Sequence, residues 1–119
     1  MHEFSICEGV VDAALEEMRK LDPPPARLRR ARIVAGALRQ IVPDAMTFAF
    51  EVLTKGTPAE GATLEIVNSP ITARCRECGW QGEIQDMRFQ CSACGAVALA
   101  LTGGDELYLE SLEIENADT

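Results

Sequence analysis

Apolar residues near the amino end recur at steps of three and four, which is the spacing of one face of an amphipathic helix. This stripe runs from Phe4 to Leu21, and Ser5 with Glu8 forms a candidate capping box at its start. Three successive prolines at positions 23 to 25 cannot continue a helix, because proline lacks a backbone N–H and clashes with the preceding turn. The pattern therefore predicts one helix at the amino end.

Three other segments show the alternating spacing of half-buried strands. They cover residues 28–36, 62–68 and 106–115. The last of these needs a partner in a sheet, and the cysteine-rich segment before it is too small to cover it. We therefore expect it to join the strands of the first part of the chain, so that the intervening segment is an insertion.

A second helix is predicted between the first two strands, over residues 44–55. Pro43 suits the first helical position because its missing N–H would have no helical partner there, and Gly56 suits the residue just past the end. Its expected core positions are Met46, Ala49, Phe50 and Leu53.

Four cysteines carry the strongest chemical signal in the chain. Cys75, Cys78, Cys91 and Cys94 form a C-x2-C-x12-C-x2-C array, and a glycine follows each pair. The two-residue spacing lets both sulfurs of a pair reach one ion, and the glycine frees backbone amides to donate to the thiolates. The array predicts a structural zinc site, filled by four sulfurs and therefore without an open catalytic position.

Rival interpretations of these cysteines remain. Iron can occupy a four-thiolate site, and the ligands alone do not distinguish it from zinc. Two local disulfides are disfavoured because two-residue spacing strains them and the polar amino end is no signal peptide. A redox site would normally have one C-x-x-C pair near a βαβ unit. The fifth cysteine, Cys7, falls on the apolar stripe of the first helix and is interpreted as a buried apolar residue.

Together the patterns predict an α+β fold class: a small mixed sheet with two helices on one face, plus an inserted four-cysteine zinc-ribbon subdomain. Residues 1–69 and 104–119 would form the α+β domain, and residues 70–103 the zinc-binding domain. Gly103-Gly104 is expected to be a flexible hinge between them.

Charge and composition exclude several classes of function. The chain of 119 residues has a net charge of −8, and residues 105–119 contain six acids and no base, which disfavours nucleic acid. The arginines at positions 27, 29, 30 and 32 are interpreted as a solvated strand face, although an acidic protein partner could use them. An enzyme is not indicated, since no second histidine or activated nucleophile accompanies His2. No apolar run is long enough to span a membrane, and the cysteine usage suits the cytoplasm.

The amino terminus is a second candidate metal site. The Met1 amine, the imidazole of His2 and the deprotonated amides of His2 and Glu3 can approach one plane, and square-planar nitrogen sites favour Ni(II) or Cu(II). A terminal Met-His is also common in disordered ends, so both interpretations stay open here.

Several segments occur together in one order along the chain. They are Met1-His2-Glu3-Phe4-Ser5, residues 42–51, 56–57 and 60–64, the four cysteines, and residues 104–107 and 111–113. This combination resembles the HypA/HybF family of nickel metallochaperones in nickel–iron hydrogenase maturation, and the resemblance covers the chain from Met1 to about Glu115.

The resemblance implies a two-metal protein. Transferred Ni(II) would bind the α+β domain at His2 and the Met1 amine, with Glu3 as a further candidate ligand, while the four cysteines hold structural Zn(II). The implied partners are a HypB-type GTPase, the hydrogenase large-subunit precursor and, in some members, urease maturation proteins. Nucleic acid and membranes are not expected as partners, and the molecule would be a monomer or a strand-exchanged homodimer.

Two departures from the family pattern leave any third protein ligand open. The members' Val-Gly-Glu-Leu stands here as Ala35-Gly36-Ala37-Leu38, so its acid is missing. Asp44 is the nearest counterpart of an acid that some members use before the second helix, but it equally suits the positive end of a helix. The alternative function is a zinc-ribbon protein-interaction module without nickel transfer.

Overall fold

The structure is a computed structural model and describes residues 2–116. The chain divides into two compact units. The first comprises Met1–Val34, Ile41–Val67 and Tyr108–Thr119, and the second Ala35–Gln40 and Asn68–Leu107. The expected division into a nickel-binding domain and a zinc-binding domain stays a prediction. Among the described residues, no helix combines the length and the apolar character needed to cross a membrane.

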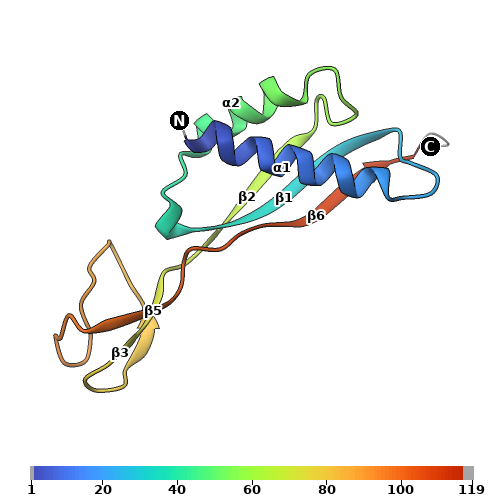
Figure 1. Ribbon diagram of the computed structural model, residues 1–119. Helices are drawn as coiled ribbons and strands as arrows, with labels where there is room; N and C mark the ends of the chain where they lie inside the picture. Colours follow the sequence, from blue (N-terminus) through green and yellow to red (C-terminus); the bar gives the residue numbers. More distant parts are fainter. Residues whose placement is uncertain (1, 117–119) are drawn as a thin grey trace. The chain divides into compact units, whose positions relative to one another are not determined.

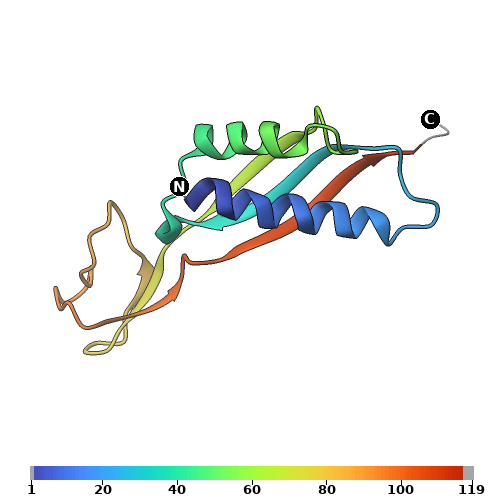
Figure 2. The same ribbon diagram turned by 45° about the horizontal axis from the view of Figure 1, so that its top comes forward.

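Two helices cover one face of a three-stranded sheet in the first unit. Helices α1 (His2–Arg19) and α2 (Pro43–Thr54) pack against each other above the sheet (Figures 1 and 2). The strand order is β2-β1-β6, with β1 (Arg27–Gly36) in the middle and β2 (Thr63–Ser69) and β6 (Leu107–Glu115) at the edges. The predicted α+β fold class is confirmed, and the last strand joins this sheet as expected.

The core of the first unit is built from the faces that the apolar pattern predicts. Phe50, Leu28, Ile33 and Met46 are fully buried there. Thr54 is also buried, which the pattern did not predict, and its hydroxyl donates a 2.7 Å hydrogen bond to the carbonyl of Phe50 one turn earlier. A threonine can therefore occupy a core position because the helix itself satisfies its polar group.

Cys7 lies in this core, as the sequence predicts. Its side chain has no exposed area, and burial raises the pKa of the thiol to about 11. The thiolate, which is the nucleophile and the metal ligand, is disfavoured at this position. Cys7 is thus an apolar packing residue.

The start of α1 corrects two expectations. The helix begins at His2, so Ser5 and Glu8 lie inside it and the predicted capping box is wrong. His2 was expected ahead of the helix, but it belongs to the first helical turn and remains exposed. The apolar spacing predicts a helix only from Phe4 onward, because neither His2 nor Glu3 continues the apolar stripe.

The second unit is a small antiparallel sheet with its own core. Strand β3 (Thr72–Cys75) lies between β4 (Gln81–Glu83) and β5 (Leu99–Gly103). Ile71, Ala73 and Ile84 form the buried cluster, and the partly buried Ala37, Leu38, Trp80 and Leu99 pack against it. Ala37 and Leu38 belong to the 3-10 helix η1 (Ala37–Arg39), so a short segment from early in the chain completes this core.

Gly104 is a closely packed position in the second unit. It is buried with φ +115°, and a Cβ atom there would lie 2.8 Å from the Cα of Ile71. Its carbonyl accepts a 2.8 Å hydrogen bond from the backbone N–H of Leu38. The expected flexible hinge is therefore wrong at Gly104, where the backbone packs closely against Ile71. Glycine permits this close approach because it has no side chain.

Replacing Gly36 with alanine is expected to destabilise the zinc-loaded protein by at least about 1–3 kcal/mol. The added Cβ would lie 2.0 Å from the Gly104 carbonyl oxygen, and backbone cannot move aside as a flexible side chain can. Gly9→Ala is the matched control, because nothing lies within 4 Å of the added methyl there and alanine favours helix by about 0.5–1 kcal/mol. Urea unfolding of the three proteins measures both effects, and equal stability of Gly36→Ala and the parent would contradict the predicted clash.

Candidate metal centres

The four cysteines that the sequence pairs by spacing meet at one point. Their sulfur atoms all lie within 4.8 Å of one another. The Cys75 and Cys94 sulfurs are 3.7 Å apart, and the Cys78 and Cys91 sulfurs 3.6 Å. Four sulfurs about 2.3 Å from a central zinc ion would form a tetrahedron with edges of about 3.8 Å. The donor set and its spacing therefore fit tetrahedral zinc.

Two similar turns position the sulfurs. Gly79 and Gly95 take φ values of +82° and +80°, and their N–H groups donate 3.0 Å hydrogen bonds to the carbonyls of Cys75 and Cys91. Each turn also directs two backbone N–H groups at the first sulfur of its pair, over 3.3–3.5 Å. The donors are Glu77 and Cys78 for Cys75, and Ala93 and Cys94 for Cys91. These bonds stabilise thiolates, as the glycine after each pair predicts.

The charge balance of the cluster favours a divalent cation. Burial opposes ionisation of Cys91, but the N–H groups of Cys94 and Ala93 outweigh it and lower the pKa of this thiol to about 6. The N–H of Ala96 favours the Cys94 thiolate, yet burial and the neighbouring sulfurs outweigh it and raise the pKa of Cys94 to about 12. Four adjacent thiolates therefore need a cation to exist together near neutral pH.

The second candidate site lies at the start of α1. The side chain of His2 is 56% exposed, and its Nε2 atom lies 3.3 Å from the Glu3 carboxylate. The backbone N–H of Val42, the residue before α2, donates a 3.2 Å hydrogen bond to the same carboxylate, and this bond lowers the pKa of Glu3 below its ordinary value. Glu3 thus joins the only imidazole of the chain to the beginning of the second helix.

Two other groups were candidates for this site, the amine of Met1 and the carboxylate of Asp44. Met1, the source of the α-amine, lies outside the described residues. Asp44 lies in the first turn of α2 and is exposed, where a carboxylate interacts favourably with the positive end of the helix dipole. The contact of Glu3 with Val42 was not predicted, because the two residues are 39 positions apart and a backbone N–H leaves no sequence signal.

The arginines of β1 form the solvated strand face that the alternating pattern predicts. Arg27 pairs with Glu115, Arg30 with Glu65 and Glu113, and Arg32 with Glu65 and Glu110, over 3.1–3.9 Å. The three arginine side chains are 45–52% exposed, so each pair contributes little to stability. Acids on both neighbouring strands balance these arginines, which argues against a positive surface for a polyanion.

Comparison with known proteins shows the family to which the chain belongs. A family model described as "Hydrogenase/urease nickel incorporation, metallochaperone, hypA" matches residues 1–114. The chain belongs to the HypA family. The resemblance seen in the motifs is confirmed, and the four-cysteine cluster agrees with the structural zinc expected for a HypA protein.

Curated relatives support the same assignment along nearly the whole chain. The hydrogenase maturation factor HypA of Nostoc punctiforme is 42% identical over 116 residues, which cover 97% of this chain and 96% of the relative. Hydrogenase maturation factor HypA 2 of Bradyrhizobium diazoefficiens is 38% identical over 115 residues, which cover 97% of this chain and all of the relative.

Two solved structures share the fold. The solution structure of the Ni metallochaperone HypA from Helicobacter pylori matches with a TM-score of 0.65 and 20% identity, covering 96% of this chain and 97% of that one. A second structure, described as the solution structure of HypA protein, matches with a TM-score of 0.68 and 22% identity, covering 96% of each chain. These structures show the fold, and the family model and the curated relatives identify the chain as a HypA-family nickel metallochaperone of hydrogenase maturation.

Proposed function

We propose that this protein binds Ni(II) at its amino terminus and delivers it to the large-subunit precursor of a nickel–iron hydrogenase. The observation that carries the proposal is the position of His2, the only histidine of a HypA-family chain, which is exposed in the first turn of α1. Imidazole and backbone nitrogen suit nickel, whereas the four sulfurs at the other site suit zinc. The two sites thus separate a transferable ion from a retained one.

The local geometry supports a nitrogen-rich site. The first N–H groups of an α-helix have no partner within the helix, and His2 and Glu3 are the first two residues of α1. Their amide nitrogens therefore make no hydrogen bond within the helix, and each can bind a metal ion by releasing its proton to water. Since Nε2 of His2 faces Glu3, we assign nickel binding to Nδ1, with the Met1 amine as a further nitrogen donor. Proton loss makes this binding weaker as the pH falls.

The remaining assignments belong to the same proposal. We infer that a HypB-type GTPase assists nickel loading, that urease maturation proteins are further partners, and that the protein works in the cytoplasm without being an enzyme. Contact with a partner would move the beginning of α2, and the Glu3 carboxylate would transmit that movement to His2 because it binds both. Release on contact needs no change at the zinc site.

Equilibrium dialysis of untagged protein against radioactive nickel, followed by mixing with purified large-subunit precursor, tests this function. We expect one transferable nickel ion per chain and its appearance in the precursor, while zinc stays with the four cysteines. Protein that retains zinc but takes up no nickel would instead be an interaction module.

Two substitutions of Glu3 separate the effect of its hydrogen bond to Val42 from the effect of its negative charge beside His2. Glu3→Ala removes the acceptor of the Val42 N–H and is expected to lower the thermal stability of the first unit. Glu3→Gln keeps an acceptor but loses the negative charge beside His2, so it should mainly weaken nickel binding, by about 10–100-fold as for other partners of metal-bound histidines. Thermal unfolding and nickel titration of both variants measure the two parts.

The same pair predicts a pH dependence. The pKa of Glu3 is lowered in the folded protein, so the stabilisation due to its charge is present above its ordinary pKa and is lost as the pH falls through the lowered value. The stability difference between the parent and Glu3→Gln should therefore vanish in acid. A difference that is the same in acid and at neutral pH would refute the role of the charge.

A further inference from the structure

Strand β6 forms an edge of the sheet in the first unit. The order β2-β1-β6 leaves its outer side without a strand partner in the described part of the chain. Unpaired backbone N–H and C=O groups along such an edge can accept a further strand. The carboxyl half of β6 is also the wall of a groove, which adds side-chain recognition to this backbone edge.

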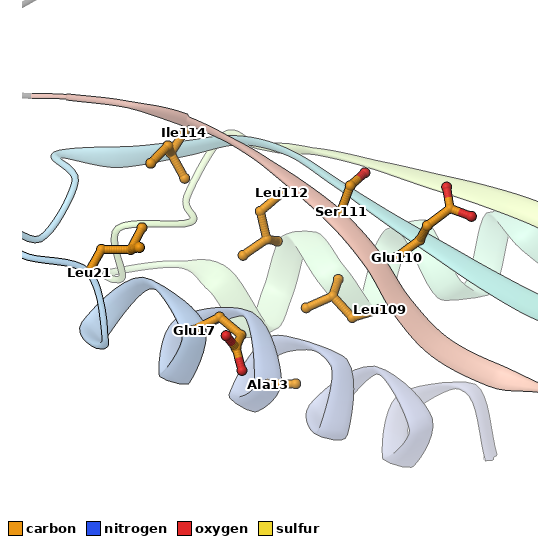
Figure 3. A pocket seen from close by; sticks show the side chains of 8 residues that line it. All are labelled: Ala13, Glu17, Leu21, Leu109, Glu110, Ser111, Leu112 and Ile114. Carbon is orange, nitrogen blue, oxygen red and sulfur yellow. The ribbon is translucent and has the colours of Figure 1, made fainter.

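The groove lies between β6 and α1 and has a volume of about 430 Å³. Figure 3 shows Leu109, Leu112 and Ile114 pointing from β6 toward the helix, whereas Glu110 and Ser111 point away from it. Ala13 and Glu17 line the groove from α1, and Leu21 lines it from the segment that follows the helix. A strand added beside β6 would therefore place every second side chain against an apolar surface and the others beside carboxylates.

Strand β1, which pairs with the inner edge of β6, indicates which kind of strand the outer edge would accept. Strand β1 alternates arginines with buried residues such as Leu28 and Ala31 along part of its length. Its Arg30 and Arg32 pair with Glu113 and Glu110 of β6. The exposed glutamates of β6 therefore already pair with the arginines of a strand that carries both basic and apolar residues. Opposite charges on adjacent strands stabilise a sheet, so a similar strand suits the outer edge of β6.

We propose that the outer edge of β6, with the groove beneath α1, docks an extended segment of a partner protein that alternates apolar and basic residues. The apolar side chains enter the groove, the basic ones meet Glu110 and Glu113, and the backbone adds a fourth strand to the sheet. This surface involves neither His2 nor the cysteines, so it can be tested without either metal being exchanged.

Charge complementarity favours this occupant over a second copy of the chain. Strand β6 carries Glu110, Glu113 and Glu115 and no base, so two β6 strands paired with each other would bring carboxylates together. Like charges directly opposite on adjacent strands are destabilising. A partner with basic residues at the same positions removes this conflict.

The probe is a capped peptide of about nine residues that alternates valine and arginine, because strands of this length match a typical sheet edge. Its binding to zinc-loaded protein is measured by fluorescence anisotropy at low salt. Two further peptides serve as controls: one has the same composition with all arginines at one end, and the other has glutamate in place of arginine. We expect the alternating basic peptide to bind at least about tenfold more tightly than either control.

Variants of the protein locate the binding. Ala13 is exposed and lines the groove, so Ala13→Glu should raise the dissociation constant at least about tenfold without disturbing the core. Ser5→Glu adds the same charge to an exposed position of α1 outside the groove and should leave binding unchanged. The proposal would be overturned if the peptide with all arginines at one end bound as tightly as the alternating peptide. It would also be overturned if Ala13→Glu left the binding of the alternating peptide unaltered. Sedimentation showing a dimer that Ala13→Glu abolishes, without peptide binding, would make a second copy the occupant.

Discussion

Replacing His2 with alanine is expected to abolish nickel binding and leave the zinc content and the fold unchanged. His2 supplies the only imidazole of the chain, and its side chain is largely exposed, so its removal leaves no cavity in the core. The zinc ligands belong to the second unit and do not include it. Nickel titration, zinc analysis and far-UV circular dichroism of the parent and the variant measure the three quantities. A nickel titration unaltered by the substitution would end the proposed site.

Two comparisons sharpen this experiment. Glu8→Ala is the matched control, because Glu8 is an exposed residue of α1 that the proposed site does not use, and nickel binding should survive. An uncleaved amino-terminal extension removes the α-amine while keeping His2, and it should also suppress nickel binding. If the extension has no effect while His2→Ala does, the imidazole acts without the terminal amine.

Local patterns predicted those parts of the molecule that depend on neighbouring residues. The apolar spacing found both helices, since Met46, Ala49 and Phe50 recur at helical steps and all three are buried. The C-x2-C spacing found the zinc cluster because two residues between cysteines are enough to shape each turn. These predictions needed no knowledge of how distant segments meet.

Contacts between distant segments were beyond the same reasoning. Gly36 and Gly104 are 68 positions apart. The sequence places Gly36 at the end of a strand and Gly104 in a hinge, although the structure needs both glycines where two backbone segments approach closely. The segment Ala35–Gln40 likewise packs with the second unit, which no composition change reveals. Tertiary packing selected these glycines for the space they leave, and that space is a property of the folded chain.

At the amino end, the candidate nickel ligands are adjacent in the sequence, but the contacts that position them could not be predicted from it. His2 and Glu3 stood out because imidazole, carboxylate and a terminal amine are adjacent in the chain. That α1 begins as early as His2, and that Glu3 holds the N–H of Val42, depends on the packing of α1 against α2. The groups proposed to bind nickel are therefore local in sequence, while the contact that would couple them to a partner is not.

Replacing Cys91 with serine is expected to release zinc and unfold the second unit while the helices persist. Cys91 is 3% exposed, accepts two backbone N–H groups and has the lowered pKa of the cluster, so serine cannot replace its thiolate. Structural zinc binding is worth about 10–16 kcal/mol in small zinc modules, far more than a core of three buried apolar residues can supply. Both α-helices belong to the first unit, so the helical signal should remain.

Zinc analysis, far-UV circular dichroism and backbone nuclear magnetic resonance spectra of the full chain distinguish this outcome from general unfolding. We expect the resonances of residues 68–107 to collapse toward unfolded positions while those of α2 stay dispersed. Cys7→Ser is the matched control, because it makes the same change at a fully buried thiol of the first unit. That variant should lower the stability of the first unit and keep its zinc, since burial and not metal binding fixes Cys7. Zinc retained by Cys91→Ser would contradict the role of Cys91 as a ligand, and helices lost together with the zinc would show that the two units do not fold separately.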